Sequence, residues 1–323
     1  MSAAPILVTG GAGYIGSILV RLLLSQGERV RVVDRMLHGA HGLADLAADG
    51  NLEVMQRDLR DPRAHADALE GVATVIHLAA IVGDKACAQD EELAVQTNWT
   101  ATVALARSAA SRGVRRFVFA STCSVYGEGR DEVLTEQSPV RPLSLYAETR
   151  WNAEQGLLET VGMEQFEPVL LRFGTVYGLS PRMRFDLVVN LLTLRAVSTG
   201  AVSIFGGTQW RPFVHVGDIV RALVMAKSAP LPDGPPILNV GDNLENYQLR
   251  DLKEEIEARI PGVSVTIVPE ATDPRTYRVS FDQIERLWGF RATKRVGEGI
   301  EEVARALKSG AIPDPGHPRY VNA

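Results

Sequence analysis

Short apolar runs alternate with longer amphipathic segments through the first 175 residues of the chain. The runs are rich in Val, Ile and Leu over their whole length, which is typical of parallel strands buried on both faces. They lie at 5–9, 29–33, 52–56, 74–78, 116–120 and 168–172. Helical patterns occupy the intervals, for example at 15–27 and at 91–113, where Gly113 ends the helix. This alternation predicts an α/β fold with a doubly wound parallel sheet.

The pattern changes after about residue 174, where Gly, Pro and Arg become frequent and turn signals such as GLSP (178–181) appear. We therefore expect a sheet domain over 1–174 and a smaller C-terminal α/β lobe over 175–323. The segment 212–240 again contains a strand pattern followed by a helix pattern. We expect that segment to return to the first sheet.

Composition narrows the classes of partner. The 323 residues carry a net charge of −5 with a pI near 5.8, which argues against nucleic acid or an anionic membrane as a partner. No apolar run approaches the roughly 18 residues of a membrane-spanning helix, and the N-terminal residues lack a basic leader. Cys87 and Cys123 form no paired motif, and the six histidines show no ligand spacing. We expect a cytoplasmic protein without a metal site.

The stretch TGGAGYIG (9–16) follows the first predicted strand and opens the first helix. Gly10 allows a tight turn, Gly13 lets a pyrophosphate approach the backbone, and Gly16 lets the helix pack closely on the strand. The second strand ends in Asp34, where a carboxylate can bind the ribose hydroxyls of adenosine. Because a carboxylate repels a 2′-phosphate, the pattern predicts a Rossmann domain that binds NAD rather than NADP.

Two neighbouring positions extend this predicted site. Arg35 directly follows the acidic residue, and Asp58 and Leu59 stand at the end of the third strand, within reach of the adenine edge. All three are therefore expected at the cofactor.

Further motifs make the chain similar to the extended short-chain dehydrogenase/reductase superfamily, and within it to the NAD-dependent nucleotide-sugar epimerase/dehydratase family. In chain order they are DLRD (58–61), HLAA (77–80), Asn98, STCSVYG (121–127), YAETR (146–150), RFGTVYG (172–178), the Asn190 segment and QWRPFVHVGD (209–218). The resemblance runs over nearly the whole chain. It implies an enzyme whose substrate is a nucleotide-diphosphate sugar.

The resemblance also implies the catalytic residues. In the family, a hydroxyl at the position of Thr122 hydrogen-bonds the reacting sugar hydroxyl, and a tyrosine at the position of Tyr146 acts as general base while hydride passes to the nicotinamide. A free tyrosine titrates near about 10, so a neighbouring cation has to lower its pKa. The family cation is a lysine, whereas this chain has Arg150.

Arginine can do part of the lysine's work. At helical spacing i+4 it lies on the same face as Tyr146, and it is a fixed cation with several donors. It cannot release a proton near neutral pH, so it is no proton relay. Three interpretations stay open: an active enzyme with Arg150 substituting electrostatically, an isomerase or mutase in which NAD is partly structural, and a non-catalytic NAD or nucleotide-sugar binding protein.

The two positions after Thr122 discriminate among reactions. The resemblance implies an Asp-Glu pair there in dehydratases and a glutamate at the second position in decarboxylases, whereas this chain has Cys123 and Ser124. Neither supplies a carboxylate, which favours an epimerase that converts an NDP-hexose through a transient keto sugar. A net reductase of 4-keto sugars is the alternative within the active interpretation.

The remaining site residues and the assembly follow from the resemblance. Cofactor contacts are expected from Tyr14, Ile15, Leu78, Ala79, Ala80, Asn98, Tyr146 and Arg150, beside the residues of the glycine-rich stretch. Substrate contacts are expected from Asp84, Lys85, Ser124, Thr175, Asn190, Arg211 and Arg275, with further positive charge from Arg182 and Arg184. Arginine suits the diphosphate because its planar fork binds two oxygens at once. Apolar positions in the helices at 91–113 and around Tyr146 imply a homodimer.

Overall fold

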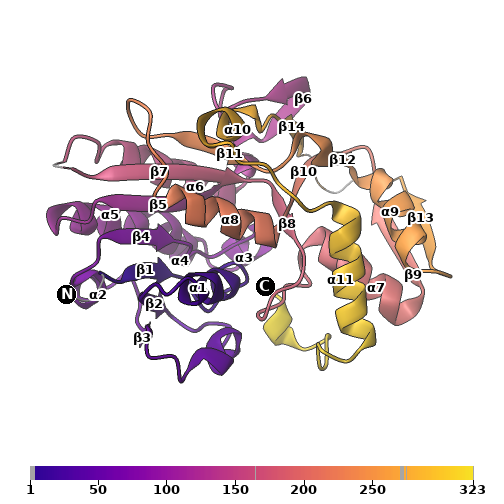
Figure 1. Ribbon diagram of the computed structural model, residues 1–323. Helices are drawn as coiled ribbons and strands as arrows, with labels where there is room; N and C mark the ends of the chain where they lie inside the picture. The colour runs from indigo at the N-terminus through magenta and orange to yellow at the C-terminus, as the bar shows by residue number, and fades with distance from the viewer. Residues whose placement is uncertain (1–3, 164, 270–272, 274, 323) are drawn as a thin grey trace.

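A seven-stranded parallel sheet forms the centre of the larger domain (Figure 1). The computed structural model describes residues 4–163, 165–269, 273 and 275–322. The strand order is β11-β7-β5-β4-β1-β2-β3, so the direction of winding reverses between β1 and β4. The strands are β1 (Ile6–Thr9), β2 (Val30–Asp34), β3 (Leu52–Gln56), β4 (Thr74–His77), β5 (Arg116–Thr122), β7 (Glu167–Phe173) and β11 (Ile237–Val240). The predicted doubly wound α/β fold is confirmed.

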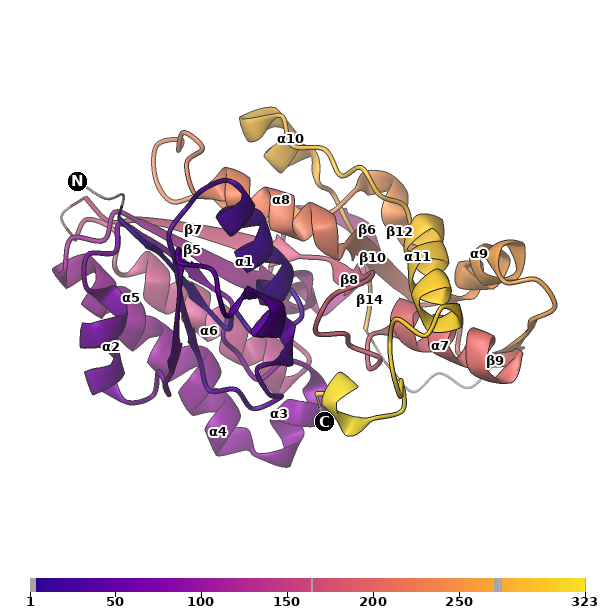
Figure 2. The same ribbon diagram turned by 60° about the horizontal axis from the view of Figure 1, so that its bottom comes forward.

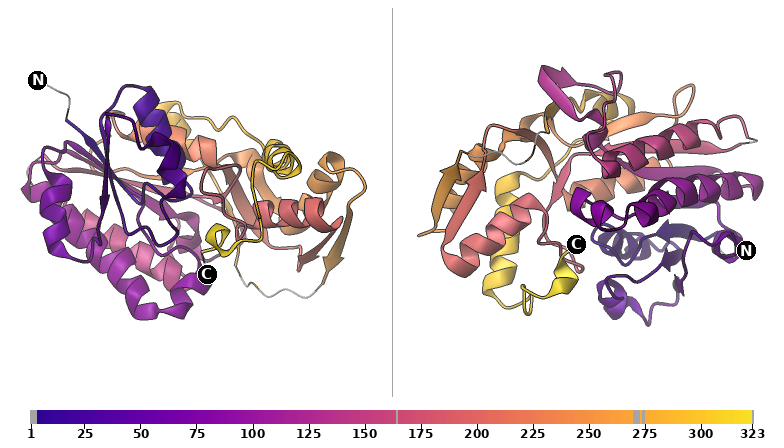
Figure 3. Two further views of the ribbon diagram at one scale, coloured as in Figure 1. Left: turned by 90° about the horizontal axis from the view of Figure 1, so that it is seen from below. Right: turned by 180° about the vertical axis from the view of Figure 1, so that it is seen from behind.

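Helices cover both faces of this sheet (Figure 3). Leu19 and Leu23 of α1 pack with Leu223 of α8 on one face, and Leu105 of α5 packs with Leu157 of α6 on the other. The covering helices are α1 (Gly16–Ser25), α8 (Val216–Ala226) and α10 (Asp282–Trp288) on the first face, and α2 (Pro62–Leu69), α5 (Ala101–Ser111) and α6 (Leu145–Leu158) on the second. Burial of both faces explains why the central strands read as continuous apolar runs.

The helix predicted over 91–113 contains a wide turn. It consists of α4 (Glu91–Val95), a π-helical turn over 96–100, and α5. The turn places the fully buried Asn98 against the loop after β4, where its Oδ1 accepts from Ile81 N at 2.7 Å and its Nδ2 donates to Ile81 O at 2.9 Å. Asn98 therefore fixes the backbone of a loop that borders the site.

Among the described residues, short sheets and a few helices make up the smaller lobe. Its strands are β8 (Thr175–Tyr177), β10 (Trp210–His215) and β12 (Asn246–Gln248) in one sheet, and β9 (Ala201–Phe205) and β13 (Ser264–Val268) in a second. A third sheet pairs β14 (Thr276–Val279) with β6 (Glu128–Leu134), which lies within the predicted 1–174 domain. The domain bounds stay a prediction. The helices of the smaller lobe are α7 (Val188–Thr199), α9 (Leu252–Arg259) and α11 (Val296–Lys308). Their apolar faces share a core around Leu192, Ile256 and Ile300.

The segment 212–240, expected to return to the large sheet, divides between the two parts of the chain. Helix α8 covers the large sheet, and β11 forms the edge of that sheet beside β7. Strand β10 instead pairs with β8 and β12 in the three-stranded sheet. The sequence pattern could not distinguish the two sheets, because a strand as buried as β10 would fit either of them.

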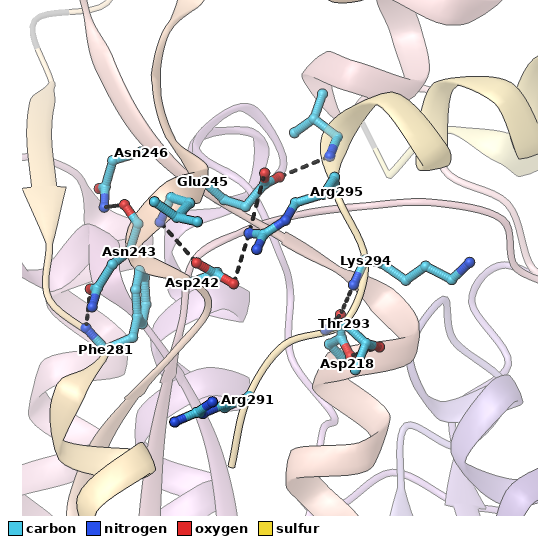
Figure 4. A network of polar contacts seen from close by, with 12 residues as sticks. Asp218, Asp242, Asn243, Glu245, Asn246, Phe281, Arg291, Thr293, Lys294 and Arg295 are labelled. Atoms are coloured by element: carbon cyan, nitrogen blue, oxygen red, sulfur yellow. Dashed lines mark hydrogen bonds and ion pairs between the residues drawn. The ribbon is translucent and has the colours of Figure 1, made fainter. Parts of the chain in front are cut away.

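Buried carboxylates hold the chain that leads into α11 (Figure 4). Asp218, in the first turn of α8, accepts from Thr293 N and Lys294 N at 3.0 Å each. Glu245 accepts from Val296 N at 2.8 Å, and burial raises the pKa of Glu245 to about 7. These contacts fix where α11 starts relative to the larger domain.

The apolar helix positions behind the homodimer prediction are partly used inside the chain. Val103, Leu105 and Leu157 are buried, and Gly156 lets α6 approach the Val103 side chain closely. The homodimer stays a prediction, which light scattering after size-exclusion chromatography tests. Among the described residues, no helix is both long and apolar enough to cross a membrane.

Candidate functional site

A cavity of about 740 Å³ opens at the carboxyl ends of the large-sheet strands, between the two parts of the chain. It reaches from the β1–α1 loop to Arg211 and Arg275 of the smaller lobe. This is the crevice where the strand order reverses, the position at which open α/β sheets bind ligands. The volume suits a ligand of drug size or larger.

The glycine-rich loop forms one wall. Gly10 has a φ of +70°, and a Cβ on it would lie 2.8 Å from the backbone nitrogen of Ala79. Gly13, Tyr14 and Ile15 line the cavity, and the Tyr14 hydroxyl donates to Gly178 O at 2.6 Å. Glycine is required at position 10 because the backbone is left-handed there and touches the β4 loop.

Asp34 stands beside this loop at the end of β2. Its two oxygens accept from the backbone nitrogens of Ala12 at 3.0 Å and Met36 at 2.8 Å. Burial raises the pKa of Asp34 despite these bonds. Arg35 Nε lies 3.3 Å from Asp58, and although burial acts to raise the pKa of Asp58, Arg60 and Arg35 lower it.

Replacing Asp34 with asparagine should weaken NAD binding about tenfold and reduce the preference for NAD over NADP, because one charged acceptor and the repulsion of a 2′-phosphate are lost. Titration calorimetry on cofactor-free protein measures both affinities. Glu53→Gln on β3 is the matched control, since that exposed carboxylate pairs with Arg31 and lies outside the cavity lining. An unchanged NAD/NADP affinity ratio in Asp34→Asn would contradict this role.

The β3 and β4 ends supply the next part of the lining. Leu59 and the HLAA residues Leu78, Ala79 and Ala80 face the cavity. The backbone nitrogens of Leu78 and Ala79 both donate to Thr9 Oγ1 at 3.2 Å. Asn98, expected at the cofactor, lies behind this wall and contacts the Ile81 backbone instead of lining the cavity.

The hydroxyl residues after β5 lie at the reactive end. Thr122 and Ser124 line the cavity, with their side-chain oxygens 2.7 Å apart. The intervening Cys123 points into the protein, where Sγ donates to Arg172 O at 3.3 Å. This alternation leaves two neighbouring hydroxyl side chains at the cavity wall.

Tyr146 and Arg150 enter the cavity from α6, which begins after Ser144, whose side chain accepts from Ala147 N at 3.3 Å. Tyr146 is half-buried, and burial raises its pKa while Arg150 acts to lower it. Arg150 is only 1% exposed and stacks on the Phe119 ring at 4.2 Å. Helix α6 thus sets a hydroxyl and a fixed cation side by side.

The guanidinium of Arg150 has spare donors. Its Nη2 donates to Ala120 O, whereas Nε and Nη1 are buried without a partner. Arg182, also 1% exposed and lining the cavity, leaves Nε and Nη2 unpartnered. Burial and the nearby Arg184 lower the pKa of Arg182 to about 10. Buried cations with open donors fit a dinucleotide, which brings ribose hydroxyls and a pyrophosphate.

Arginines also gather at the opposite end. Asp273 accepts from Arg211 at 2.8 Å and from Arg275 at 2.6 Å, and Arg275 also pairs with Asp84 at 2.6 Å across the cavity. Although burial acts to raise the pKa of Asp273, the two arginines lower it strongly. Of the DPRTYR stretch (273–278), Pro274 lies outside the described residues.

The other predicted substrate residues are placed as follows. Thr175 lines the cavity from β8, and Lys85 is an exposed residue on its rim at α3 (Asp84–Gln89). Asn190 is fully buried and does not line the cavity. Its side chain bonds Gly178 N at 3.0 Å and the Tyr14 hydroxyl at 3.2 Å, which joins the smaller lobe to the glycine-rich loop.

Sequence reasoning missed several lining residues. Asp273 belongs to no predicted role, although its position two residues before Arg275 is a signal for a local ion pair. Val321 and Asn322 also line the cavity, and they carry no motif that could have identified them. Among the described residues, no group of three or more His, Cys, Asp or Glu side chains is arranged to hold a metal.

Comparison with known proteins agrees with this geometry. The family model described as the NAD dependent epimerase/dehydratase family matches residues 6–241. A UDP-glucose 4-epimerase of Cyamopsis tetragonoloba is 31% identical over 98% of this chain and 97% of its own length. A UDP-glucuronate 4-epimerase of Thermodesulfobacterium geofontis is 32% identical over 79% of this chain and 80% of its own.

Among solved structures, MoeE5 in complex with UDP-glucose and NAD is 31% identical, with a TM-score of 0.81 over 95% of this chain and 99% of that one. The same protein is also known in complex with UDP-glucuronic acid and NAD. The NAD-dependent family and these NAD complexes confirm the cofactor prediction.

Proposed function

The chain belongs to the NAD-dependent epimerase/dehydratase family of enzymes that act on nucleotide sugars. Within this family, we propose that it is a UDP-hexose 4-epimerase. It would invert C4 through a transient 4-keto sugar and keep NAD bound throughout. Relatives and structural neighbours named as UDP-sugar 4-epimerases or bound to UDP-sugars support UDP as the nucleotide.

One observation carries the proposal. Thr122, Ser124, Tyr146 and Arg150 line the same cavity as the glycine-rich loop, and neither residue after Thr122 is a carboxylate. Dehydration or decarboxylation needs acid–base work at carbons beside C4. The small neutral side chains at positions 123 and 124 supply no carboxylate for that work, and Asp84 and Asp273 of the same cavity are paired with Arg275. This favours return of the hydride to the keto sugar over loss of water or carbon dioxide.

In the proposed mechanism, Thr122, Tyr146 and Arg150 each have a distinct role in oxidising the C4 hydroxyl. Thr122 hydrogen-bonds the C4 hydroxyl of the sugar. Tyr146 takes the proton of that hydroxyl while the hydrogen on C4 leaves as hydride. Arg150 favours the tyrosinate form because its cation lies on the same helix face. Bound NAD supplies the hydride acceptor. With NAD bound, Arg150 Nε and Nη1 would be free to donate to hydroxyls of the nicotinamide ribose.

The second half of the cycle reverses these roles. The keto sugar would turn its other face toward the reduced cofactor, the hydride taken in the first half would return to C4 on that face, and Tyr146 would return the proton to the C4 oxygen. Arg211 and Arg275 hold the diphosphate, so the sugar rotates about a fixed anchor. During binding, the diphosphate competes with Asp273 and Asp84 for Arg275.

The test uses UDP-glucose and UDP-glucuronic acid carrying deuterium at C4. An epimerase should give the C4 epimer with the label still at C4, and with a primary isotope effect on single-turnover rates. Mass spectrometry of the denatured protein should show NAD, and NMR identifies the product. The comparison of the two sugars identifies the preferred substrate.

The other outcomes would overturn the proposal. Loss of water or carbon dioxide would indicate a dehydratase or decarboxylase, and stoichiometric consumption of NADH would indicate a reductase. An isomer formed without an isotope effect would indicate a mutase. Saturable binding with no product at any protein concentration would indicate a binding protein. The cytoplasmic location stays a prediction.

Replacing Arg211 with alanine should raise KM for the UDP-sugar about ten- to a hundredfold while changing kcat less, because a diphosphate contact is lost before the chemical step. Steady-state kinetics with NAD-saturated protein measure both constants. Arg295→Ala is the matched control, since this arginine of the same lobe pairs with Asp242 outside the cavity lining. Equal KM values for the two variants would contradict the assignment.

A further inference from the structure

The chain returns to the larger domain after α11 (Figure 2). We call residues 312–322 the strap. Ile312 and Tyr320 of the strap are buried in a cluster that includes Tyr14 of the glycine-rich loop and Phe185. Phe185 N donates to Tyr320 O at 2.8 Å, and the two rings meet edge to face at 5.8 Å. The strap is therefore anchored to both parts of the chain.

The strap also contacts the cofactor side of the cavity. The Tyr320 ring meets the His41 ring edge to face at 6.5 Å, and His41 opens the short helical turn η1 (His41–Leu46) after β2. The next glycine, Gly42, is packed so closely that an added Cβ would lie 3.1 Å from Arg182 Cβ. Asp34, the predicted ligand of the adenosine ribose, ends the strand that leads to this turn, so Tyr320 lies on the predicted adenosine side of the cavity.

Beyond Tyr320, the strap enters the cavity wall. Val321 and Asn322 are lining residues together with Leu37 and Arg182. The Asn322 Oδ1 is buried without a hydrogen-bond partner, as are Nε and Nη2 of Arg182. A buried amide oxygen and a buried guanidinium are costly unless a ligand bonds them. Both residues line the same cavity, and an open acceptor together with an open cation matches a nucleotide, which brings hydroxyl or amino donors as well as phosphate.

We propose that the strap is part of the dinucleotide site: Tyr320 anchors it, Asn322 hydrogen-bonds the bound NAD, and the cofactor leaves only when the strap moves. The proposal rests on NAD binding and not on which sugar is converted. It gives a physical reason for a cofactor that stays bound through many turnovers, since the strap covers the dinucleotide from a segment far away in sequence.

The test measures cofactor release directly. Protein loaded with NADH is mixed with excess NAD, and the loss of NADH fluorescence gives the dissociation rate. Asn322→Ala should accelerate release about three- to tenfold, the effect of one buried hydrogen bond. Tyr320→Ala should accelerate it at least about tenfold, because the anchor of the whole strap is removed. Both should retain less NAD after gel filtration.

Lys308→Ala is the control, because Lys308 is exposed at the end of α11 and lies outside the cavity lining. Its release rate should match that of the unsubstituted protein. Circular dichroism and the Tm of the cofactor-free forms verify folding. If Tyr320→Ala does not fold, the NADH release rate of Asn322→Ala alone tests the proposal. An unchanged release rate in folded Asn322→Ala overturns the proposal, and it does so whether or not the protein epimerises a sugar.

Discussion

Replacing Tyr146 with phenylalanine should lower kcat by about 10²- to 10⁴-fold, the range typical of a lost general base. The substitution removes one oxygen and keeps the ring that packs at the start of α6. NAD should still bind, because Arg150 and the glycine-rich loop are untouched. Single-turnover measurements with the NAD-loaded variant separate the chemical step from substrate binding.

Tyr247→Phe is a matched control for that result. Its hydroxyl lies 3.5 Å from Glu255 in the smaller lobe, outside the cavity lining. Loss of this hydroxyl should leave kcat nearly unchanged. Equal kcat values for Tyr146→Phe and Tyr247→Phe would contradict the assignment of Tyr146 as the general base.

The fold was predictable because its signals are local. The central strands β1, β4, β5 and β7 are buried on both faces, so their apolar runs show in the sequence without knowledge of their partners. The glycine-rich loop was equally predictable, because this turn needs a left-handed backbone at position 10 and glycine adopts it without strain. Asp34 follows at a fixed distance along the same unit.

Other features depend on contacts between distant residues. Asn98 and Ile81 meet only through the π-helical turn, and a helical pattern does not show such a turn. Strand β10 has a buried pattern that would suit either sheet. Asn322 reaches the cavity because α11 directs the following segment back to the larger domain, so no nearby motif marks it.

The consequence of arginine at position 150 can be tested by pH dependence. Arg150→Met keeps an unbranched side chain but removes the charge, and kcat at pH 7 should fall at least about a hundredfold. Arg150 favours ionised Tyr146, so its loss should raise the pKa of that hydroxyl. Because the base must be ionised, the pH at which the rate rises should move upward. A pH profile of single-turnover rates at saturating NAD measures the shift.

Arg150→Lys restores a cation and should recover more activity than Arg150→Met, with the rising limb returning toward lower pH. Recovery should be partial, since lysine lacks the planar group that stacks on Phe119 while it donates to Ala120 O. The contrast between the two variants separates charge from shape. If Arg150→Met has the pH profile of the unsubstituted enzyme at equal NAD occupancy, the cation does not tune Tyr146. Arg150 would then serve only to hold the cofactor.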